Sequence, residues 1–306
     1  MIIKDSTLED LRTAFQRTFD EAYRAMAPET FWTRVALEAS SSSTSNTYGW
    51  LGQFPGLREW IGDRVVKSLK EDSYQILNKT WEDTLGVSRP DVEDDNLGVY
   101  TGLIQGLAQQ AAEHPDLLIA QLMAEGHARL CFDGQNYFDT DHPVFANADG
   151  TGAATTVSNY DDAAGSTDPA WYLLDCRNQM RPFIFQRRMA PELESKTSPT
   201  TSDQVFMKDA FLYGVRARHN AGYGFWQKAL KSRRALDLAA FREARAEMRG
   251  WTGDGGRKLG VRPSILVVGA SRQAEAEDLI LRDLIEGGNK NPVYNAVDVI
   301  VSDWLD

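Results

Sequence analysis

The chain has 306 residues, of which 42% are hydrophobic and 25% are charged, values typical of a globular protein with one large domain or two modest ones. No apolar run reaches the roughly 20 residues that a membrane-spanning helix needs, the N-terminus lacks signal-peptide features, and two cysteines are too few for a disulfide framework. The formal net charge of −11 at pH 7 argues against a dedicated nucleic-acid binder, which neutralises phosphates with Lys and Arg.

The first predicted element is an amphipathic helix over residues 6–26. Ser6 and Glu9 form a capping-box signature at its start, and Pro28 ends it. Apolar residues recur along one face at steps of three and four residues: Leu8, Leu11, Phe15, Phe19, Tyr23 and Met26. A terminal helix of this kind packs on its own domain or docks on a neighbouring subunit, and the pattern is compatible with both.

An aromatic-rich segment follows the polar stretch of residues 40–47. Residues 49–60 read GWLGQFPGLREW, which is too broken by glycine for a long helix and too apolar to remain in water. Strand-like runs at Arg64–Leu69 and Tyr74–Leu85 then predict a long hairpin over Gly49–Leu85. Because such a hairpin is marginal alone, it folds back on its own domain or reaches across to another subunit.

A long helix is predicted from Leu97 to about Leu130, after the acidic run Asp91–Asn96. Pro115 interrupts the pattern, which leaves one kinked helix and two consecutive helices as alternatives. At a rise of 1.5 Å, about 33 residues would span about 50 Å, a length that favours a spine-like role.

The rest of the sequence alternates between strand-like and helical runs. Asp237 is expected to cap a helix that continues through Arg249. A β–α unit follows, with a buried strand at Ile265–Val268 and a helix at Arg272–Ile285. Further strands are predicted at Tyr172–Leu174, Phe183–Phe185, Gln204–Met207, Phe211–Arg216 and Val297–Val301.

No catalytic constellation or metal site is apparent in the sequence. The four histidines lie far apart, and no H-E-x-x-H or paired-cysteine spacing occurs. Residues 139–142 (DTDH) come nearest to a ligand cluster, but they lack the further oxygen ligands of a calcium loop and are typical of a turn. Cys131 and Cys176 could each pair with a histidine, although an inert buried thiol is the commoner fate. We therefore expect no catalytic residue, no cofactor and no metal.

A glycine-rich stretch, Gly253–Gly260, has neither the spacing of a phosphate-binding loop nor a strand directly before it. It is expected to form a flexible hairpin or connector. One alternative function nevertheless rests on it, an α/β nucleotide-binding protein or enzyme that uses this loop. A third alternative, a protease or scaffold associated with a larger assembly, would need a catalytic Ser or a long charged helix, and neither is seen in the sequence.

Motifs spread along nearly the whole chain resemble, in order, those of the Mu-like prophage major head subunit family. They include Ser45–Gly52, Glu93–Gly98, Cys131–Asn136, Asp141–Pro143, Arg181–Gln186, Ala221–Gln227 and Gly253–Gly260. The resemblance implies an α+β fold, the HK97-like phage capsid fold, with an N-terminal arm, an extended β-hairpin loop, a peripheral domain with a long spine helix, and an axial domain.

The same resemblance implies how the chain divides and what it does. The arm with its helix would cover residues 1–48, the extended hairpin loop 49–88, the spine helix of the peripheral domain 89–135, and the remaining peripheral and axial segments 136–306. The implied function is a major capsid protein, without enzymatic activity, that self-assembles into the icosahedral shell enclosing the DNA genome of a tailed bacteriophage. Since the chain begins with Met1, no removed scaffold segment is expected.

The surfaces that hold such a shell together would lie on the arm and the hairpin. The candidate intersubunit contacts are Phe15, Phe19, Tyr48, Trp50, Leu51, Phe54, Leu57, Arg58, Glu59, Trp60 and Arg64. The expected partners are further copies of the chain, in pentamers and hexamers, with a portal, a scaffold or protease and a decoration protein. Packaged double-stranded DNA would be touched only non-specifically, and no membrane is involved. Assembly in the host bacterial cytoplasm and residence in the virion are expected.

Overall fold

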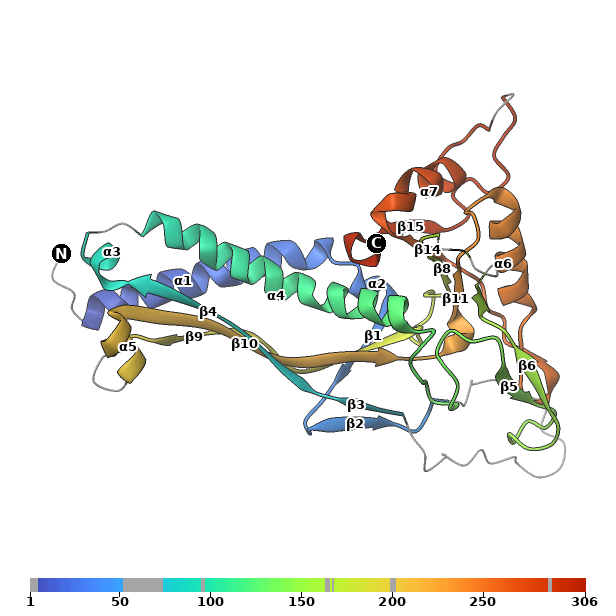
Figure 1. Cartoon of the computed structure of the whole chain (residues 1–306), viewed down its shortest axis with the longest axis horizontal. Helices are drawn as coiled ribbons and strands as arrows, with labels where there is room; N and C mark the ends of the chain where they lie inside the picture. Colours follow the sequence, from blue (N-terminus) through green and yellow to red (C-terminus); the bar gives the residue numbers. More distant parts are fainter. Residues whose placement is uncertain are drawn as a thin grey trace.

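The chain forms an elongated layered part with an upright unit at one end (Figure 1). The computed structural model describes residues 5–51, 74–94, 97–162, 166, 168–198, 202–285 and 288–306. Its helices are α1 (Asp5–Met26), α2 (Trp32–Val35), α3 (Arg89–Glu93), α4 (Gly98–Glu125), α5 (Asp203–Lys208), α6 (Leu238–Gly250) and α7 (Gln273–Ile280). Within the described ranges, none of these helices combines the length and apolar character that crossing a bilayer requires.

The strands form two main sheets and three short ribbons. The elongated part contains β1 (Ala36–Ser40), β4 (Lys79–Ser88), β9 (Phe183–Lys196) and β10 (Ala210–Tyr223), in the order β1-β9-β10-β4. The upright unit contains β7 (Tyr160–Asp161), β8 (Trp171–Leu174), β11 (Ala229–Ser232), β14 (Ile265–Val268) and β15 (Asp298–Val301), in the order β15-β14-β8-β11-β7. The ribbons are β2 (Ser45–Tyr48) with β3 (Tyr74–Leu77), β5 (His142–Phe145) with β6 (Ala154–Val157), and β12 (Thr252–Gly253) with β13 (Arg257–Lys258).

Alternation along β9 places different neighbours on the two faces of the long sheet. Phe183 and Phe185 point toward the side covered by α4, where they join a core with Ile119 and Met123. Ile184 points to the opposite side, where it packs in a separate cluster with Ile76 of β3. The β2–β3 ribbon and α4 therefore lie on opposite faces of the sheet, as Figure 1 also shows.

Helix α1 lies against α4 through the apolar face that its periodicity predicts. Leu11, Phe15 and Phe19 are buried with Ile104 and Ala108 of α4. The Phe15 ring meets Tyr213 of β10 edge to face, with ring centroids 5.0 Å apart. Aromatic pairs in this arrangement add roughly 0.5–1.5 kcal/mol beyond the area they bury. The arm helix is thus part of the core of its own subunit.

Helix α4 is continuous through Pro115, which settles the alternative left open by the sequence. Buried residues lie on both sides of the proline, with Ala112 before it and Leu118 after it, so packing on the sheet holds the two halves in line. The neighbouring carboxylate of Asp116 accepts hydrogen bonds from the backbone N–H groups of Phe31 (3.1 Å) and Trp32 (2.7 Å). This carboxylate ties the start of α2 to the middle of α4.

The upright unit has a sheet that is buried on both faces. In β14, Ile265 and Val267 face the core shared with α4, while Leu266 and Val268 face α6 and α7. Asp237 caps α6, because its side chain accepts a hydrogen bond from the N–H of Ala240. A near-continuous apolar run in β14 is the pattern expected of a strand covered on both sides. The predicted α6 and β14 are confirmed.

Three predicted elements need correction, and the first is the long helix, which ends at Glu125 rather than near Leu130. Residues Gln204–Met207, predicted as a strand, lie in α5, which ends where Asp209 adopts a left-handed conformation (φ 46°). The predicted helix Arg272–Ile285 is shorter, because α7 ends at Ile280. The amide of Asn291 donates to the carbonyls of Leu279 and Arg282, which satisfies the acceptors at the end of this helix.

The bounds of the predicted hairpin also differ from the structure. The antiparallel pair is β2 with β3, in which Ser45 is opposite Leu77 and Tyr48 is opposite Tyr74. Residues 79–88, assigned to the hairpin from the sequence, instead form β4 at the edge of the long sheet, paired with β10. The predicted run Arg64–Leu69 lies outside the described residues. Sequence pattern alone did not distinguish β3 from β4, since the two strands are separated only by Asn78.

A pair of histidines joins α4 to the long sheet. His114 Nδ1 lies 2.8 Å from His219 Nε2, and the Trp81 ring of β4 covers His114 at a centroid distance of 4.3 Å. Burial, with smaller contributions from His114 and Arg187, lowers the pKa of His219 to about 3. Burial also lowers the pKa of His114. Both rings are therefore held neutral at pH 7.

We expect the free energy of unfolding to fall as the pH decreases below about 6.5, because the unfolded chain then binds protons that the folded pair does not. The contribution of His219 between pH 6.5 and 5 is about 2 kcal/mol. His219→Gln should lack this part of the pH slope in urea unfolding of the unassembled subunit at pH 7, 6 and 5. His127→Gln is the comparison variant: its ring is largely exposed, and its pKa is lowered by partial burial and by Lys231, so it should remove a smaller part of the slope. Parallel pH profiles for His219→Gln and wild type would contradict this account.

Candidate assembly surface

The β2–β3 ribbon borders residues 52–73, which lie outside the described residues. We call residues 45–51 and 74–78 the hairpin root. Tyr48 closes β2 and Tyr74 opens β3, and the two residues are directly opposite each other. On the return side, the chain passes from β3 through Asn78 into β4. The backbone N–H of Asn78 donates to the carbonyl of Thr44 at 2.9 Å, which closes the root.

A buried glutamine fastens the hairpin root to the long sheet. Gln186 of β9 is fully buried. Its Oε1 accepts a hydrogen bond from the Tyr48 hydroxyl at 2.8 Å, and its Nε2 donates to the Ile76 carbonyl (3.1 Å) and to Asn78 Oδ1 (2.9 Å). A buried amide with these partners specifies one position for the ribbon, because any displacement leaves polar groups unpaired.

Two residues of β10, Gly222 and Tyr223, also hold the hairpin root against the long sheet. A Cβ added at Gly222 would lie 2.5 Å from Ile76 Cδ1 and 3.1 Å from the Tyr74 hydroxyl. The absence of a side chain at Gly222 therefore lets β3 pack closely against β10. The backbone N–H of Tyr223 donates to the Tyr74 hydroxyl at 3.0 Å. Burial raises the pKa of Tyr74 to about 12, which keeps this hydroxyl protonated.

An apolar cluster completes the root. Tyr48 and Leu51 are buried together with Ile184 and Phe225. The half-buried ring of Trp50 lies with its centroid 5.5 Å from that of Phe225. Fully burying a side chain of this size contributes on the order of 1.5–3 kcal/mol. The root is therefore a rigid part of the subunit, held by both hydrogen bonds and packing.

The structure places part of the predicted set of intersubunit contacts. Phe15 and Phe19 are 2% and 1% exposed in the core under α1, so their side chains pack within the subunit, and their contact with a neighbour stays a prediction. Tyr48 and Leu51 are likewise buried within the hairpin root. Trp50 keeps part of its surface exposed. The remaining candidates, Phe54, Leu57, Arg58, Glu59, Trp60 and Arg64, lie outside the described residues.

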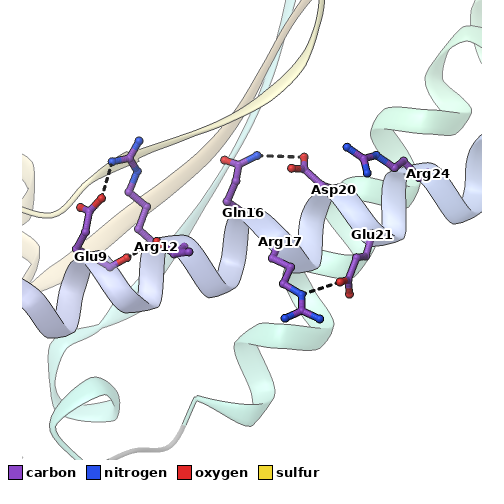
Figure 2. Close-up of a pocket in the computed structure, with 8 residues that line it drawn as sticks. Glu9, Arg12, Gln16, Arg17, Asp20, Glu21 and Arg24 are labelled. Atoms are coloured by element: carbon purple, nitrogen blue, oxygen red, sulfur yellow. Dashed lines mark hydrogen bonds and ion pairs between the residues drawn. The ribbon is translucent and has the colours of Figure 1, made fainter.

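The outer face of α1 is charged rather than apolar. Figure 2 shows a shallow pocket along this face, lined only by side chains of the one helix. Arg17 pairs with Glu21 at 2.7 Å and Arg12 pairs with Glu9 at 3.2 Å, all four side chains being largely exposed. Exposed pairs of this kind contribute little to stability, because water screens them. The arrangement is typical of a solvated helix face and has no enclosed space for a small ligand.

Several large apolar side chains are exposed at places that sequence reasoning did not select. Val99 and Leu103 lie near the start of α4, Met207 lies on α5, and Leu281, Leu284 and Tyr294 lie in the segment after α7. Leu103 is one of the apolar residues along α4, yet it is 47% exposed. A period of 3.6 identifies which residues share a helix face, but only tertiary packing shows where that face is covered.

The structure contradicts the alternative that rested on the glycine-rich stretch. Residues Gly253–Gly260 include the β12–β13 ribbon, and no long helix starts from them. Asp254 Oδ1 accepts a hydrogen bond from the backbone N–H of Phe145, which ties the ribbon to β5. A phosphate-binding loop needs backbone N–H groups at a helix N-terminus. Here the stretch is a structural connector.

Burial favours the protonated thiol form of both buried cysteines. Burial raises the pKa of Cys176 to about 12 and raises that of Cys131 as well. Among the described residues, one group could hold a metal ion: ligand atoms of Cys131, Asp133 and His142 lie within 4.8 Å of one another. The sequence did not reveal this group, because its spacing matches no familiar metal motif.

The whole chain is similar to proteins of one family. The model of the Mu-like prophage major head subunit gpT matches residues 8–305. The major capsid protein of Escherichia phage Mu is 41% identical over 308 aligned residues, covering all of both chains. The Mu-like prophage FluMu major head subunit of Haemophilus influenzae is 42% identical, covering 90% of this chain and 88% of that protein.

Solved structures agree with these relatives. A chain in the procapsid of bacteriophage JBD30 is 46% identical and superposes with a TM-score of 0.88, covering 99% of this chain and 100% of that chain. A chain in the JBD30 capsid is 35% identical in its superposition, with a TM-score of 0.73 and complete coverage of both chains. The conformation described here is thus more similar to the procapsid chain than to the capsid chain.

Gln186→Ala should loosen the hairpin root without unfolding the subunit. The Tyr48 hydroxyl and the Ile76 carbonyl lose a buried partner, which costs about 1–3 kcal/mol. Urea unfolding of the unassembled subunit measures the loss, and hydrogen exchange should rise at residues 74–78. Asn220→Ala is a matched control, because its amide donates to the Leu77 carbonyl in an exposed position and should cost about 0.5–1.5 kcal/mol. Equal losses for the two variants would contradict the role of Gln186.

Proposed function

The chain belongs to the Mu-like prophage major head subunit family and is a major capsid subunit of a tailed phage with the HK97-like fold, and on this premise we propose that residues 52–73 join neighbouring subunits. Copies of the chain would associate through this segment into pentamers and hexamers of an icosahedral shell around the phage genome. The family is a structural capsid family, and we propose that this chain, too, performs no catalysis and needs no cofactor.

The anchoring of the hairpin root is the observation that carries this proposal. Leu51 and Tyr74 are held on the long sheet. A force exerted by a neighbouring subunit on the segment between them would therefore be transmitted to the core of the subunit. Two extended arms of about 11 residues each would reach roughly 35 Å from the root. A segment fastened rigidly at its base and long enough to leave its own subunit is suited to bridging two copies.

The composition of the segment supplies the binding energy. Phe54, Leu57 and Trp60 are large apolar residues, and each contributes on the order of 2–3 kcal/mol when buried against a neighbour. Contacts of this size, repeated across every copy, stabilise a shell through multivalency. Because the segment of one subunit would bind a different surface of the next, the interface is heterologous and can close into rings.

Charged residues in the segment would set the register of these contacts. Arg58, Glu59 and Arg64 can pair with opposite charges on an adjacent subunit. Such pairs determine orientation and specificity more than affinity. The partly exposed Trp50, at the base of the segment, would extend the same apolar contact.

Further partners follow from the place of the subunit in a phage head. The JBD30 capsid is decorated with minor capsid protein trimers, and we propose that the outer surface of this shell binds a similar decoration protein. A portal and a scaffold or protease would act during assembly in the host bacterial cytoplasm. Packaged double-stranded DNA would be touched only non-specifically, since a net charge of −11 disfavours tight phosphate binding.

Replacing residues 52–73 by a short Gly-Ser linker should give a folded subunit that forms no shells, because the root is retained while the bridging segment is lost. Circular dichroism and thermal unfolding check the fold, and negative-stain electron microscopy with sedimentation checks assembly. Trp60→Ala should weaken assembly more than the conservative Trp60→Phe. Closed shells of wild-type size from the linker variant would show that the segment does not join subunits.

A further inference from the structure

The turn after α4 brings together three side chains with different ligand atoms. Cys131 Sγ lies 3.1 Å from Asp133 Oδ1, and His142 Nδ1 lies 2.7 Å from Asp133 Oδ2. Cys131 and Asp133 belong to a tight turn between the bridged residues Leu130 and Asn136, in which Gly134 has a φ of 88°. His142 begins β5 and is fully buried.

Asn159 determines which ring nitrogen of His142 carries a hydrogen: it is Nε2, the nitrogen farther from Asp133. The amide nitrogen of Asn159 faces the carbonyls of Tyr137 (2.9 Å), Trp226 (3.4 Å) and Ala229 (3.3 Å), so it must be the donor end. Its Oδ1 accepts the backbone N–H of Asp139 at 2.9 Å and faces His142 Nε2 at 3.2 Å. Since this oxygen can only accept, Nε2 of His142 carries a hydrogen.

The other ring nitrogen of His142, Nδ1, consequently needs a positively charged partner, either a proton or a metal ion. With hydrogen on Nε2, the Nδ1 of a neutral ring presents a lone pair to the Asp133 carboxylate 2.7 Å away. Two lone pairs at this distance repel, so either a second proton or a metal ion must lie between them. The Trp226 ring stacks on His142 at a centroid distance of 4.0 Å and an angle of 9°, and its face favours positive charge on the imidazole.

We propose that Cys131, Asp133 and His142 bind one divalent transition-metal ion, with Zn²⁺ as the ion that this sulfur, nitrogen and oxygen donor set suits best. The Nε2–H bond to Asn159 is the outer hydrogen bond that orients a metal-binding imidazole. The Asp133 side chain is 11% exposed, which leaves an edge where water supplies a fourth ligand. The ion would fasten the end of α4 to the β5–β6 ribbon.

Binding changes protonation and geometry in defined ways. The ion replaces the thiol proton of Cys131 and the proton between His142 and Asp133, and both protons leave to solvent. At a tetrahedral centre with bonds of about 2.0–2.1 Å, nitrogen and oxygen ligands lie about 3.3 Å apart. The gap of 2.7 Å between His142 and Asp133 would therefore open by about half an ångström. The turn of residues 131–135 can supply that movement, because Asp133 lies at its tip.

Cobalt substitution tests the site directly on the unassembled full-length subunit. Chelator-treated protein titrated with Co²⁺ should bind one equivalent, with a thiolate-to-cobalt charge-transfer band and the strong visible bands of four-coordinate cobalt. Zn²⁺ should displace the cobalt and raise the Tm. Cys131→Ser should abolish the charge-transfer band, whereas Cys176→Ser, at the other buried thiol, should retain it.

Two results would overturn the proposal. One is the absence of stoichiometric binding and of the charge-transfer band in wild type, which would assign a proton, and hence an imidazolium ion, to the gap between His142 and Asp133. The other is a charge-transfer band of equal strength in Cys131→Ser, which would place the metal elsewhere. Neither result bears on shell assembly through residues 52–73.

Discussion

The antiparallel pairing of β9 with β10 is the constraint on which the rest of the subunit depends. The two strands, 14 residues each, run the length of the elongated part. Their residues belong to three of the apolar clusters, and the chain just after β10 supplies Phe225 to the cluster beneath the hairpin root. One ladder therefore fixes the positions of α4, of the arm helix and of the root together. A slip of one residue would turn Ile184 toward α4 and Phe185 toward the root.

This ladder also explains why the arm and the root are parts of the subunit core rather than free surfaces. The large side chains nearest the sheet, including Phe19, Tyr48 and Leu51, bury their area against it. Two buried polar side chains add to this: Gln186 fastens the root, and Asp116 fastens the start of α2 to α4. Among the described residues, large apolar side chains that stay exposed lie, for example, near the start of α4 and after α7. We propose that assembly energy comes mainly from residues other than those that stabilise the fold.

The sequence predicted those elements whose stabilising pattern is local. The three- and four-residue steps of α1, the cap and face of α6, and the apolar run of β14 are each visible within a short window. Elements that depend on contacts between distant parts of the chain could not be predicted in this way. The polar strand Ser45–Tyr48 is a strand only because it pairs with β3, and Gln204–Met207 is helical although its composition suits a strand equally well. The family and fold followed from motifs spread over the whole chain, whereas the group formed by Cys131, Asp133 and His142 required three-dimensional proximity.

We propose that a subunit fastened at its hairpin root reaches its neighbour through residues 52–73. Electron cryo-microscopy of particles assembled from the purified chain tests this proposal. We expect closed shells in which Trp60 of one subunit is buried against an adjacent subunit, while the root stays attached to Gln186 of its own sheet. Closed shells in which Trp60 packs against its own subunit would contradict it.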